Sequence, residues 1–251
     1  MAGAVGGADR PRIAIIIDDI GYRHIEDHRV LELPPAVAVA VLPESPHGKR
    51  IARLAAAQKR EVLLHLPMQS LHPGQNNALL GPGALHADMT ETALRRRLAA
   101  SLAAVPQATG VNNHMGSLLT QQPQPMRWLM QALSCHRNLY FVDSYTTHLS
   151  VAHDIAHDHQ LPSIRRDVFI DGDRQESAMR AQLARLLSIA ERKGHALAIG
   201  HPLPATLELL EEFTQTLDAR GIDLVSPAML VSIPEPHAER VNPSNLTAKA
   251  R

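Results

Sequence analysis

The stretch IAIIIDDIGY, residues 13–22, runs from five apolar residues directly into two adjacent aspartates. An apolar run of this length is typical of a strand that is buried on both faces in a parallel sheet. Asp18 and Asp19 stand at the carboxyl end of that strand, predicted at 13–18. Neighbouring carboxylates repel each other and are costly to bury without partners. The pair is therefore either the solvated end of a strand or part of a site that holds a cation or performs chemistry.

Similar short apolar runs follow along the chain, separated by stretches with apolar residues at helical spacing. We expect further strands at 37–42, 61–66, 110–114, 139–143, 163–170, 196–200 and 222–226. We expect helices at 47–59, 90–104, 124–136 and 174–193, the second of them capped by Thr90. Strands that alternate with helices indicate a mostly parallel sheet covered by helices. The predicted fold class is therefore α/β, either a barrel or an open sheet.

No change in composition divides the chain, which is 251 residues long. We expect one domain over residues 12–233, preceded by a flexible lead over 1–11 and followed by a polar, disordered tail over 234–251. Residues 70–89 are rich in Gly, Pro and Asn. A loop of this length is more often functional than incidental.

The composition excludes several classes of function. Lys and Arg total 25, and so do Asp and Glu, so the chain has no surplus charge for nucleic acid or an anionic membrane. No run of 18 apolar residues predicts a membrane span, and the single cysteine, Cys135, excludes a disulfide within the chain and a cysteine-rich metal cluster. The opening residues lack the basic and apolar segments of a signal peptide. This is expected both of a cytoplasmic protein and of an exported one whose signal is removed. The sequence does not indicate an oligomeric state.

Polar side chains recur at the carboxyl ends of the predicted strands, the edge at which parallel α/β folds bind their ligands. Beyond the aspartate pair, these side chains are His65, Asn113, His114, Ser117, Asp143, Ser144 and His201. Two carboxylates and three histidines suit a divalent ion such as zinc, bound by N and O ligands with one position left open. Histidine is also the usual proton shuttle near neutral pH, and the chain holds 15 of them. We therefore expect these strand ends to form one site in which an ion, a base and an acid act on water.

Six motifs carry a resemblance to a known family. In this order, IDDIGY, LLHLPM, GVNNHMGS, FVDS, RRDVFID and AIGHP make residues 12–232 resemble the divergent polysaccharide deacetylases, relatives of the NodB-type carbohydrate esterases. The resemblance implies a distorted (β/α) barrel. It also implies a metal-dependent hydrolase whose partner is a carbohydrate, from which it removes N- or O-acetyl groups.

The aspartate pair and two histidines take roles from this resemblance. In the related esterases the first aspartate is the catalytic base and the second binds the metal, which implies that Asp18 is the base and Asp19 a ligand to zinc. Those esterases take two further ligands from a His-x-x-x-His motif, in which His65 occupies the first position. Gln69 stands at the second position, where the motif requires histidine. His114, from the neighbouring strand, is the natural candidate for the missing ligand.

The later motifs supply the remaining roles. His201 is implied to be the general acid, and Arg166 to orient the catalytic aspartate through a bidentate ion pair. Arg166 could instead pair at the surface with an aspartate at 167, 171 or 173. The polar residues beside the site are expected to bind substrate: Asn113, Ser117, Asp143 and Ser144. Alternatively, the last two only fix the rim of the barrel.

Two other functions compete with the deacetylase hypothesis. The departure at Gln69 suits a carbohydrate-binding or envelope scaffold protein that has kept the fold and lost the reaction, and measured zinc content separates the two. A glycoside hydrolase places its two carboxyl groups about 5 Å or more apart, on opposite sides of the bond, which adjacent aspartates suit poorly. Residues 153–159, HDIAHDH, place His153 and His157 at the i, i+4 spacing of a metal-binding pair. No Glu follows His153, so we expect a solvated helix face there.

Overall fold

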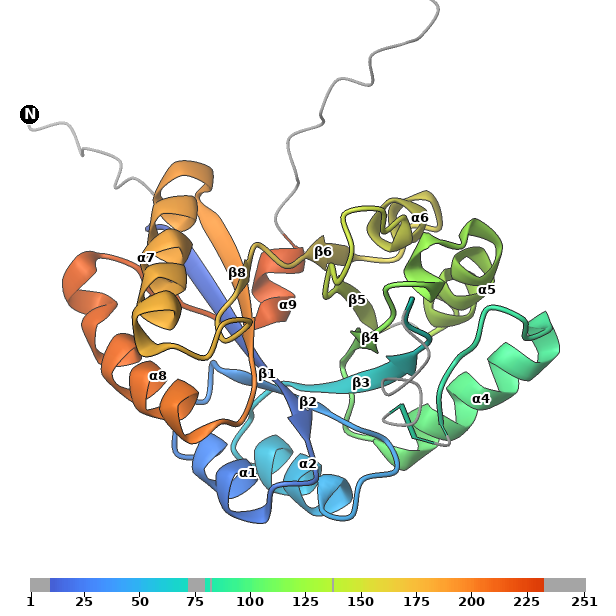
Figure 1. Cartoon of the computed structure of the whole chain (residues 1–251), viewed down its shortest axis with the longest axis horizontal. Coiled ribbons are helices and arrows are strands. Elements are labelled where there is room, and N and C mark those ends of the chain that lie inside the picture. Colours follow the sequence, from blue (N-terminus) through green and yellow to red (C-terminus); the bar gives the residue numbers. More distant parts are fainter. Residues whose placement is uncertain (1–9, 72–79, 82, 137, 233–251) are drawn as a thin grey trace, which may run out of the picture.

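The computed structural model describes residues 10–71, 80, 81, 83–136 and 138–232. Figure 1 shows a strongly curled sheet with most helices arranged around its outer side. Every pairing between named strands of the described residues is parallel. The predicted α/β class is therefore confirmed, and of the two architectures left open the chain adopts the barrel-like one.

Strands and helices alternate along the chain, as the hydrophobic pattern predicts. The strands are β1 (Arg12–Ile20), β2 (Ala38–Val41), β3 (Val62–Met68), β4 (Gly110–Met115), β5 (Tyr140–Asp143), β6 (Ser163–Arg165), β7 (Val168–Phe169), β8 (His195–Gly200) and β9 (Asp223–Leu224). The α-helices are α1 (His24–Val30), α2 (Gly48–Ala57), α4 (Glu91–Ala104), α5 (Pro123–Ser134), α6 (Ala152–Asp158), α7 (Glu176–Lys193), α8 (Pro204–Thr216) and α9 (Pro227–Val231), and the short 3-10 helices are η2 (Leu119–Gln121) and η3 (Asp218–Arg220). Thr90 caps α4 as expected, because its hydroxyl accepts a hydrogen bond from the N–H of Ala93 at 3.3 Å.

The segment 163–170 corrects the prediction of a single strand. It forms β6 and β7, which lie at opposite ends of the strand order β6-β5-β4-β3-β2-β1-β8-β7. The N–H of Arg166 donates to the carbonyl of Asp143 at 3.0 Å, and the N–H of Asp167 donates to the carbonyl of Leu197 at 2.9 Å. Two consecutive residues thus reach both edges of the sheet, which curls into a distorted barrel. A hydrophobic pattern indicates which residues are buried but not which strand they pair with. The sequence therefore does not predict the division of 163–170 into two strands.

The sheet separates two apolar clusters, and β1 contributes to both. Ile13, Ile15 and Ile17 belong to the larger cluster, which also contains the buried residues of the surrounding helices. Ala14 and Ile16 belong to the smaller cluster, which the sheet encloses together with α9. Alternate residues of a strand point to opposite faces, so the apolar run of β1 is buried on both sides. The carboxyl ends of the parallel strands consequently meet at one end of the barrel.

Some predictions fall on parts of the chain that are not described. Residues 1–9 of the predicted lead, the whole predicted tail 234–251, and 72–79 and 82 of the predicted loop lie outside the described residues. Within the described ranges, no helix is both long enough and apolar enough to cross a membrane.

Candidate active site

A bulge at the end of β1 lets both aspartates face one centre. The strand pairs regularly with β2 at Ile16 and Ile17, but its register has shifted by Ile20. Between them Asp19 takes a left-handed backbone conformation, with φ of 58°. On a regular strand adjacent side chains would point to opposite faces. Aspartate tolerates this conformation better than most residues, but the conformation still carries strain of about 1 kcal/mol, and such strain is concentrated at functional sites.

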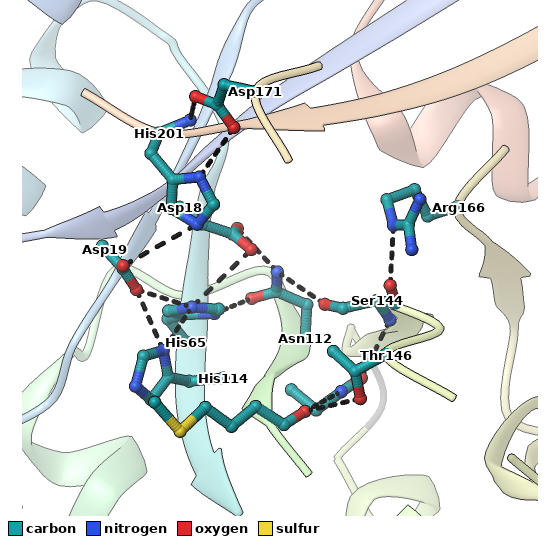
Figure 2. A network of polar contacts seen from close by, with 12 residues as sticks. Asp18, Asp19, His65, Asn112, His114, Ser144, Thr146, Arg166, Asp171 and His201 are labelled. Atoms are coloured by element: carbon teal, nitrogen blue, oxygen red, sulfur yellow. Dashed lines mark hydrogen bonds and ion pairs between the residues drawn. The ribbon is translucent and has the colours of Figure 1, made fainter. Parts of the chain in front are cut away.

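Three ligand atoms from β1, β3 and β4 converge beside this bulge (Figure 2). Asp19 Oδ1 lies 3.1 Å from His65 Nε2 and 2.9 Å from His114 Nδ1, and the two ring nitrogens are 3.1 Å apart. Ligands of a tetrahedral ion with bonds of about 2.0–2.1 Å lie roughly 3.3 Å from one another. The three atoms therefore need to move apart by only a few tenths of an ångström to surround a zinc ion.

The chemistry of these atoms also fits a cation. Asp19 Oδ1 is buried and makes no hydrogen bond to any described residue, although the two rings lie close to it. Burial alone would raise the pKa of Asp19, but the nearby rings of His114 and His65 hold it well below its usual range. Burial would likewise lower the pKa of His65, yet the charges of Asp18 and Asp19 raise it. Asp19 is therefore ionised, and its buried carboxylate is a ligand that suits a divalent cation.

Asn112 fixes the protonation and orientation of the first histidine. Its side-chain oxygen accepts a hydrogen bond from His65 Nδ1 at 2.9 Å, which leaves Nε2 of the neutral ring free as a ligand. Its amide nitrogen donates to Asp18 Oδ1 at 2.8 Å and to Ser144 Oγ at 3.3 Å. Sequence reasoning missed Asn112 and named Asn113. The signal lies in the register, because Asn112 stands directly opposite His65 on the neighbouring strand.

Asp18 has the environment of a base. Its side chain is 5% exposed, and Oδ2 lies 3.6 Å from His65 Nε2. Burial raises the pKa of Asp18, while the charges of His65 and His201 and the hydrogen bond from Asn112 oppose that rise. A carboxylate with a raised pKa takes up a proton more readily than an ordinary aspartate.

His201 faces the same centre from the end of β8. Its Nε2 lies 3.7 Å from Asp19 Oδ2, and its Nδ1 makes a 2.8 Å hydrogen bond with Asp171 Oδ1. Asp171 Oδ2 also accepts from the N–H of His201 and from the hydroxyl of Thr206, both at 2.8 Å. Burial would lower the pKa of His201, but the hydrogen bond and charge of Asp171, with the charges of Asp18 and Asp19, raise it to about 9. His201 is thus protonated at neutral pH.

Arg166 does not pair with Asp18, which corrects the predicted bidentate ion pair. Its guanidinium donates to the carbonyls of Ser144 and Tyr145 at 2.7 and 3.0 Å and lies over the ring of Phe169. Within the described ranges it makes no ion pair or hydrogen bond with Asp18. The carbonyls of the loop after β5 take up the N–H groups of its guanidinium instead, so Arg166 holds that loop in place.

The aspartates expected as alternative surface partners of Arg166 bind other groups. Asp167 binds the N–H of Leu197 and the ammonium of Lys193, and the buried Asp171 binds His201. The carboxylate of Asp173 accepts from the N–H of Gln175. Sequence reasoning treated Asp171 as a surface residue, although it follows β7 as the other site residues follow their strands.

Three of the residues expected to bind substrate make hydrogen bonds within the protein instead. The Asn113 side chain donates to the carbonyl of Met115 at 2.6 Å and accepts from the N–H of Ser144 at 2.8 Å. The side chain of Asp143 is fully buried and accepts from the N–H of Tyr145 and the hydroxyl of Ser150. Ser117 Oγ accepts from the N–H of Leu71 at 3.0 Å. Asn113 and Asp143 are too buried to reach a sugar and instead fix the rim of the barrel, the alternative left open for Asp143. Ser144 is the one of the four that hydrogen-bonds to the Asn112 amide beside Asp18.

Gln69 and the pair of His153 and His157 are not among the three converging ligands. The Gln69 side chain accepts a hydrogen bond from the N–H of Ala87 at 2.9 Å, so it anchors a loop. His114 reaches the centre instead, as expected. His153 and His157 lie on α6, with His157 exposed. Among the described residues, the only group of three or more His, Cys, Asp and Glu side chains with metal-binding geometry is Asp19, His65 and His114.

Comparison with protein families and known proteins supports the resemblance drawn from the motifs. The model of the family described as divergent polysaccharide deacetylase matches residues 15–231. The curated "Uncharacterized protein YibQ" of Escherichia coli strain K12 is 38% identical over 224 residues, which are 89% of this chain and 68% of YibQ.

Solved structures share the fold. The uncharacterized protein ATU2773 from Agrobacterium tumefaciens C58 is 25% identical with a TM-score of 0.84, covering 89% of this chain and 90% of its own. A mutant of a CE4 family pseudoenzyme from Bacillus anthracis, described as having restored enzymatic activity, is 17% identical with a TM-score of 0.52. That match covers 89% of this chain and 68% of the other. Likeness at this low identity concerns the fold alone, and it confirms the predicted distorted barrel.

Proposed function

Since the chain belongs to the divergent polysaccharide deacetylase family, we propose that it is a metal-dependent hydrolase that removes an N- or O-acetyl group from a polysaccharide or oligosaccharide. One observation carries the proposal. Asp19, His65 and His114 bring three ligand atoms within 4.8 Å of one another, beside a buried carboxylate and a protonated histidine. Two histidines and one carboxylate with an open position are the ligand set of a catalytic zinc.

The side chains divide the work of the reaction. A divalent ion such as zinc, held by Asp19, His65 and His114, would polarise the acetyl carbonyl and lower the pKa of water toward about 7. Asp18 takes a proton from the attacking water. His201 gives its proton to the sugar nitrogen or oxygen as the bond from that atom to the acetyl carbon breaks. The products are acetate and a free amine or hydroxyl.

An acetate assay tests the proposal. The purified protein is incubated with an N-acetylated chitin oligosaccharide and with an O-acetylated xylan oligosaccharide, and released acetate is measured enzymatically. We expect acetate from at least one of them, together with the matching loss of acetyl mass from the sugar. Zinc-loaded protein that releases no acetate from either substrate would contradict the proposal.

The scaffold hypothesis predicts a different result in the same experiment. It rests on the departure at Gln69, and a CE4 pseudoenzyme is among the proteins of similar fold. The position of His114 favours the enzyme, because its ring offers a third ligand atom where the motif histidine is missing. A scaffold would bind the acetylated oligosaccharide and release no acetate. A glycoside hydrolase is disfavoured because Asp18 and Asp19 face one centre instead of lying on two sides of a bond.

The Asp171→Asn variant is expected to move the alkaline limit of activity to lower pH. His201 must be protonated to act as an acid, so activity should be present below its pKa of about 9 and be lost as pH rises through that value. Asp171 supplies both a hydrogen bond and a negative charge that raise this pKa. Their removal should shift the alkaline limb of the kcat/KM profile down by about one pH unit or more.

The control for this profile is Asp173→Asn, which changes an exposed aspartate two residues away. Its alkaline limb should coincide with that of the unmodified protein. An Asp171→Asn profile with an unchanged limb would show that His201 is not the acid.

A further inference from the structure

Two arginines line a cavity that opens beside the proposed centre. The cavity has a volume of about 270 Å³, and Asp19 and His201 form part of its wall. Arg23 and Arg174 line it as well, with Phe169 as an apolar surface. Because Asp19 and His201 face the reacting group in the proposed reaction, the cavity is where the part of the substrate next to the acetyl group would lie.

Two hydrogen bonds to a buried carboxylate hold the turn that carries Arg23. The turn connects β1 to α1, and Gly21 in it has φ of 128°, which favours glycine. Asp27 is fully buried, and its Oδ2 accepts from the N–H groups of Gly21 and Arg23 at 3.0 and 3.1 Å. The backbone at Arg23 is therefore fixed, while its side chain is exposed.

The loop that carries Arg174 is held in a similar way. It runs from β7 to α7 and contains Asp171, whose carboxylate is bound by His201 and Thr206. Asp173 then accepts a hydrogen bond from the N–H of Gln175 at 3.0 Å, which closes a turn around Arg174. Two fixed loops thus place two arginines in the lining of one cavity.

The charges of the cavity leave both guanidinium groups available to a ligand. The carboxylates that line it are Asp19, which faces His65 and His114, and Asp171, which is bound to His201. In the ranges that the structure describes, no carboxylate lies within ion-pair distance of Arg23 or Arg174. Two cations with no ion-pair partner among the described residues, on anchored loops beside the proposed centre, have the arrangement that binds a carboxylate or phosphate oxygen.

We propose that this cavity is an anion subsite, formed by Arg23 and Arg174, that binds a carboxylate carried by the acetylated sugar or by its neighbour. The inference rests on the proposed function and narrows its substrate to acidic acetylated glycans. Each guanidinium donates charge-assisted hydrogen bonds to the carboxylate, and each such contact is worth about tenfold in binding. Phe169 offers an apolar surface to the sugar ring.

A pair of substrates that differ in the charge of their carboxyl groups tests the subsite. One is a tetrasaccharide of alternating N-acetylglucosamine and glucuronate, and the other is the same tetrasaccharide with its carboxylates methyl-esterified. We expect kcat/KM for acetate release to be about 100-fold higher for the acidic form. The ratio of the two values should fall about tenfold in Arg23→Gln and in Arg174→Gln, and approach one in the double variant.

The matched control is Arg53→Gln, which removes an exposed arginine on α2 that does not line the cavity. It should keep the ratio of the unmodified protein. A ratio near one in the unmodified protein, or a high ratio that survives in the double variant, would overturn the subsite while the deacetylase activity stands.

Calorimetry separates a failure of the subsite from a failure of the proposed function. If neither tetrasaccharide releases acetate, binding of both to the unmodified protein and to the double variant is measured without turnover. If the affinity for the acidic form is about 100-fold lower in the double variant than in the unmodified protein, the subsite is supported. Equal binding of the two forms, or no binding of either, would overturn it.

Discussion

The Asp18→Asn variant is expected to retain its zinc and lose almost all turnover. Asparagine has nearly the shape of aspartate and can still hydrogen-bond with Asn112, so Asp19, His65 and His114 should keep their positions. It cannot take up a proton from water. General base catalysis contributes about 10²–10⁴-fold, and we expect kcat to fall by about 10³-fold.

The measurement for this variant has two parts. Elemental analysis should give about one zinc per chain, as in the unmodified protein, and the acetate assay should give the reduced kcat. The control is Asp218→Asn, an exposed aspartate that pairs with Arg10 just before β1, at the opposite end of the strand from the site. Loss of zinc from the variant would indicate that Asp18 is itself a metal ligand. A variant that kept most of its kcat would show that Asp18 is not the base.

The His114→Ala variant is expected to lose zinc and activity together. In the proposed zinc site His114 supplies one of three ligand atoms, in place of the motif histidine at whose position Gln69 stands. Loss of a partner residue outside the ligand set typically costs 10–100-fold in metal affinity, so loss of a ligand should cost more than about 100-fold. The zinc content of the dialysed protein should fall well below one per chain, and acetate release should fall to background.

The control for this variant is His157→Ala, which removes an exposed histidine from the i, i+4 pair on α6. It should keep both zinc and activity. A His114→Ala protein with full zinc content, or a His157→Ala protein without zinc, would contradict the assignment of the ligands. Circular dichroism of both variants distinguishes loss of the ion from loss of the fold.

Much of the fold follows from short sequence patterns. The run that ends in Asp18 and Asp19 is buried on both faces, so its apolar pattern leaves little choice of structure. The strand ends at His65, His114 and His201 were predictable for a related reason. Parallel strands deliver their carboxyl ends to one edge, and a polar residue directly after an apolar run is conspicuous there.

The residues that sequence reasoning missed act through partners far away in the chain. Asn112 is recognised only through its register with His65, and Asp171 only through its contact with His201. The predicted ion pair of Arg166 is wrong for the same reason. Its guanidinium donates to two backbone carbonyls, and no sequence motif identifies a backbone carbonyl as a partner. The bulge at Asp19 likewise depends on the pairing of β1 with β2.

A zinc titration of the metal-free protein tests whether acetate release depends on the ion. The chelated and dialysed chain receives increasing zinc, and bound zinc and the rate of acetate release are measured on the same samples. We expect the rate to rise in proportion to bound zinc and to stop rising at one ion per chain. A rate of acetate release that is already maximal without zinc would contradict the proposed function. So would protein that binds one zinc per chain and releases no acetate from any acetylated glycan.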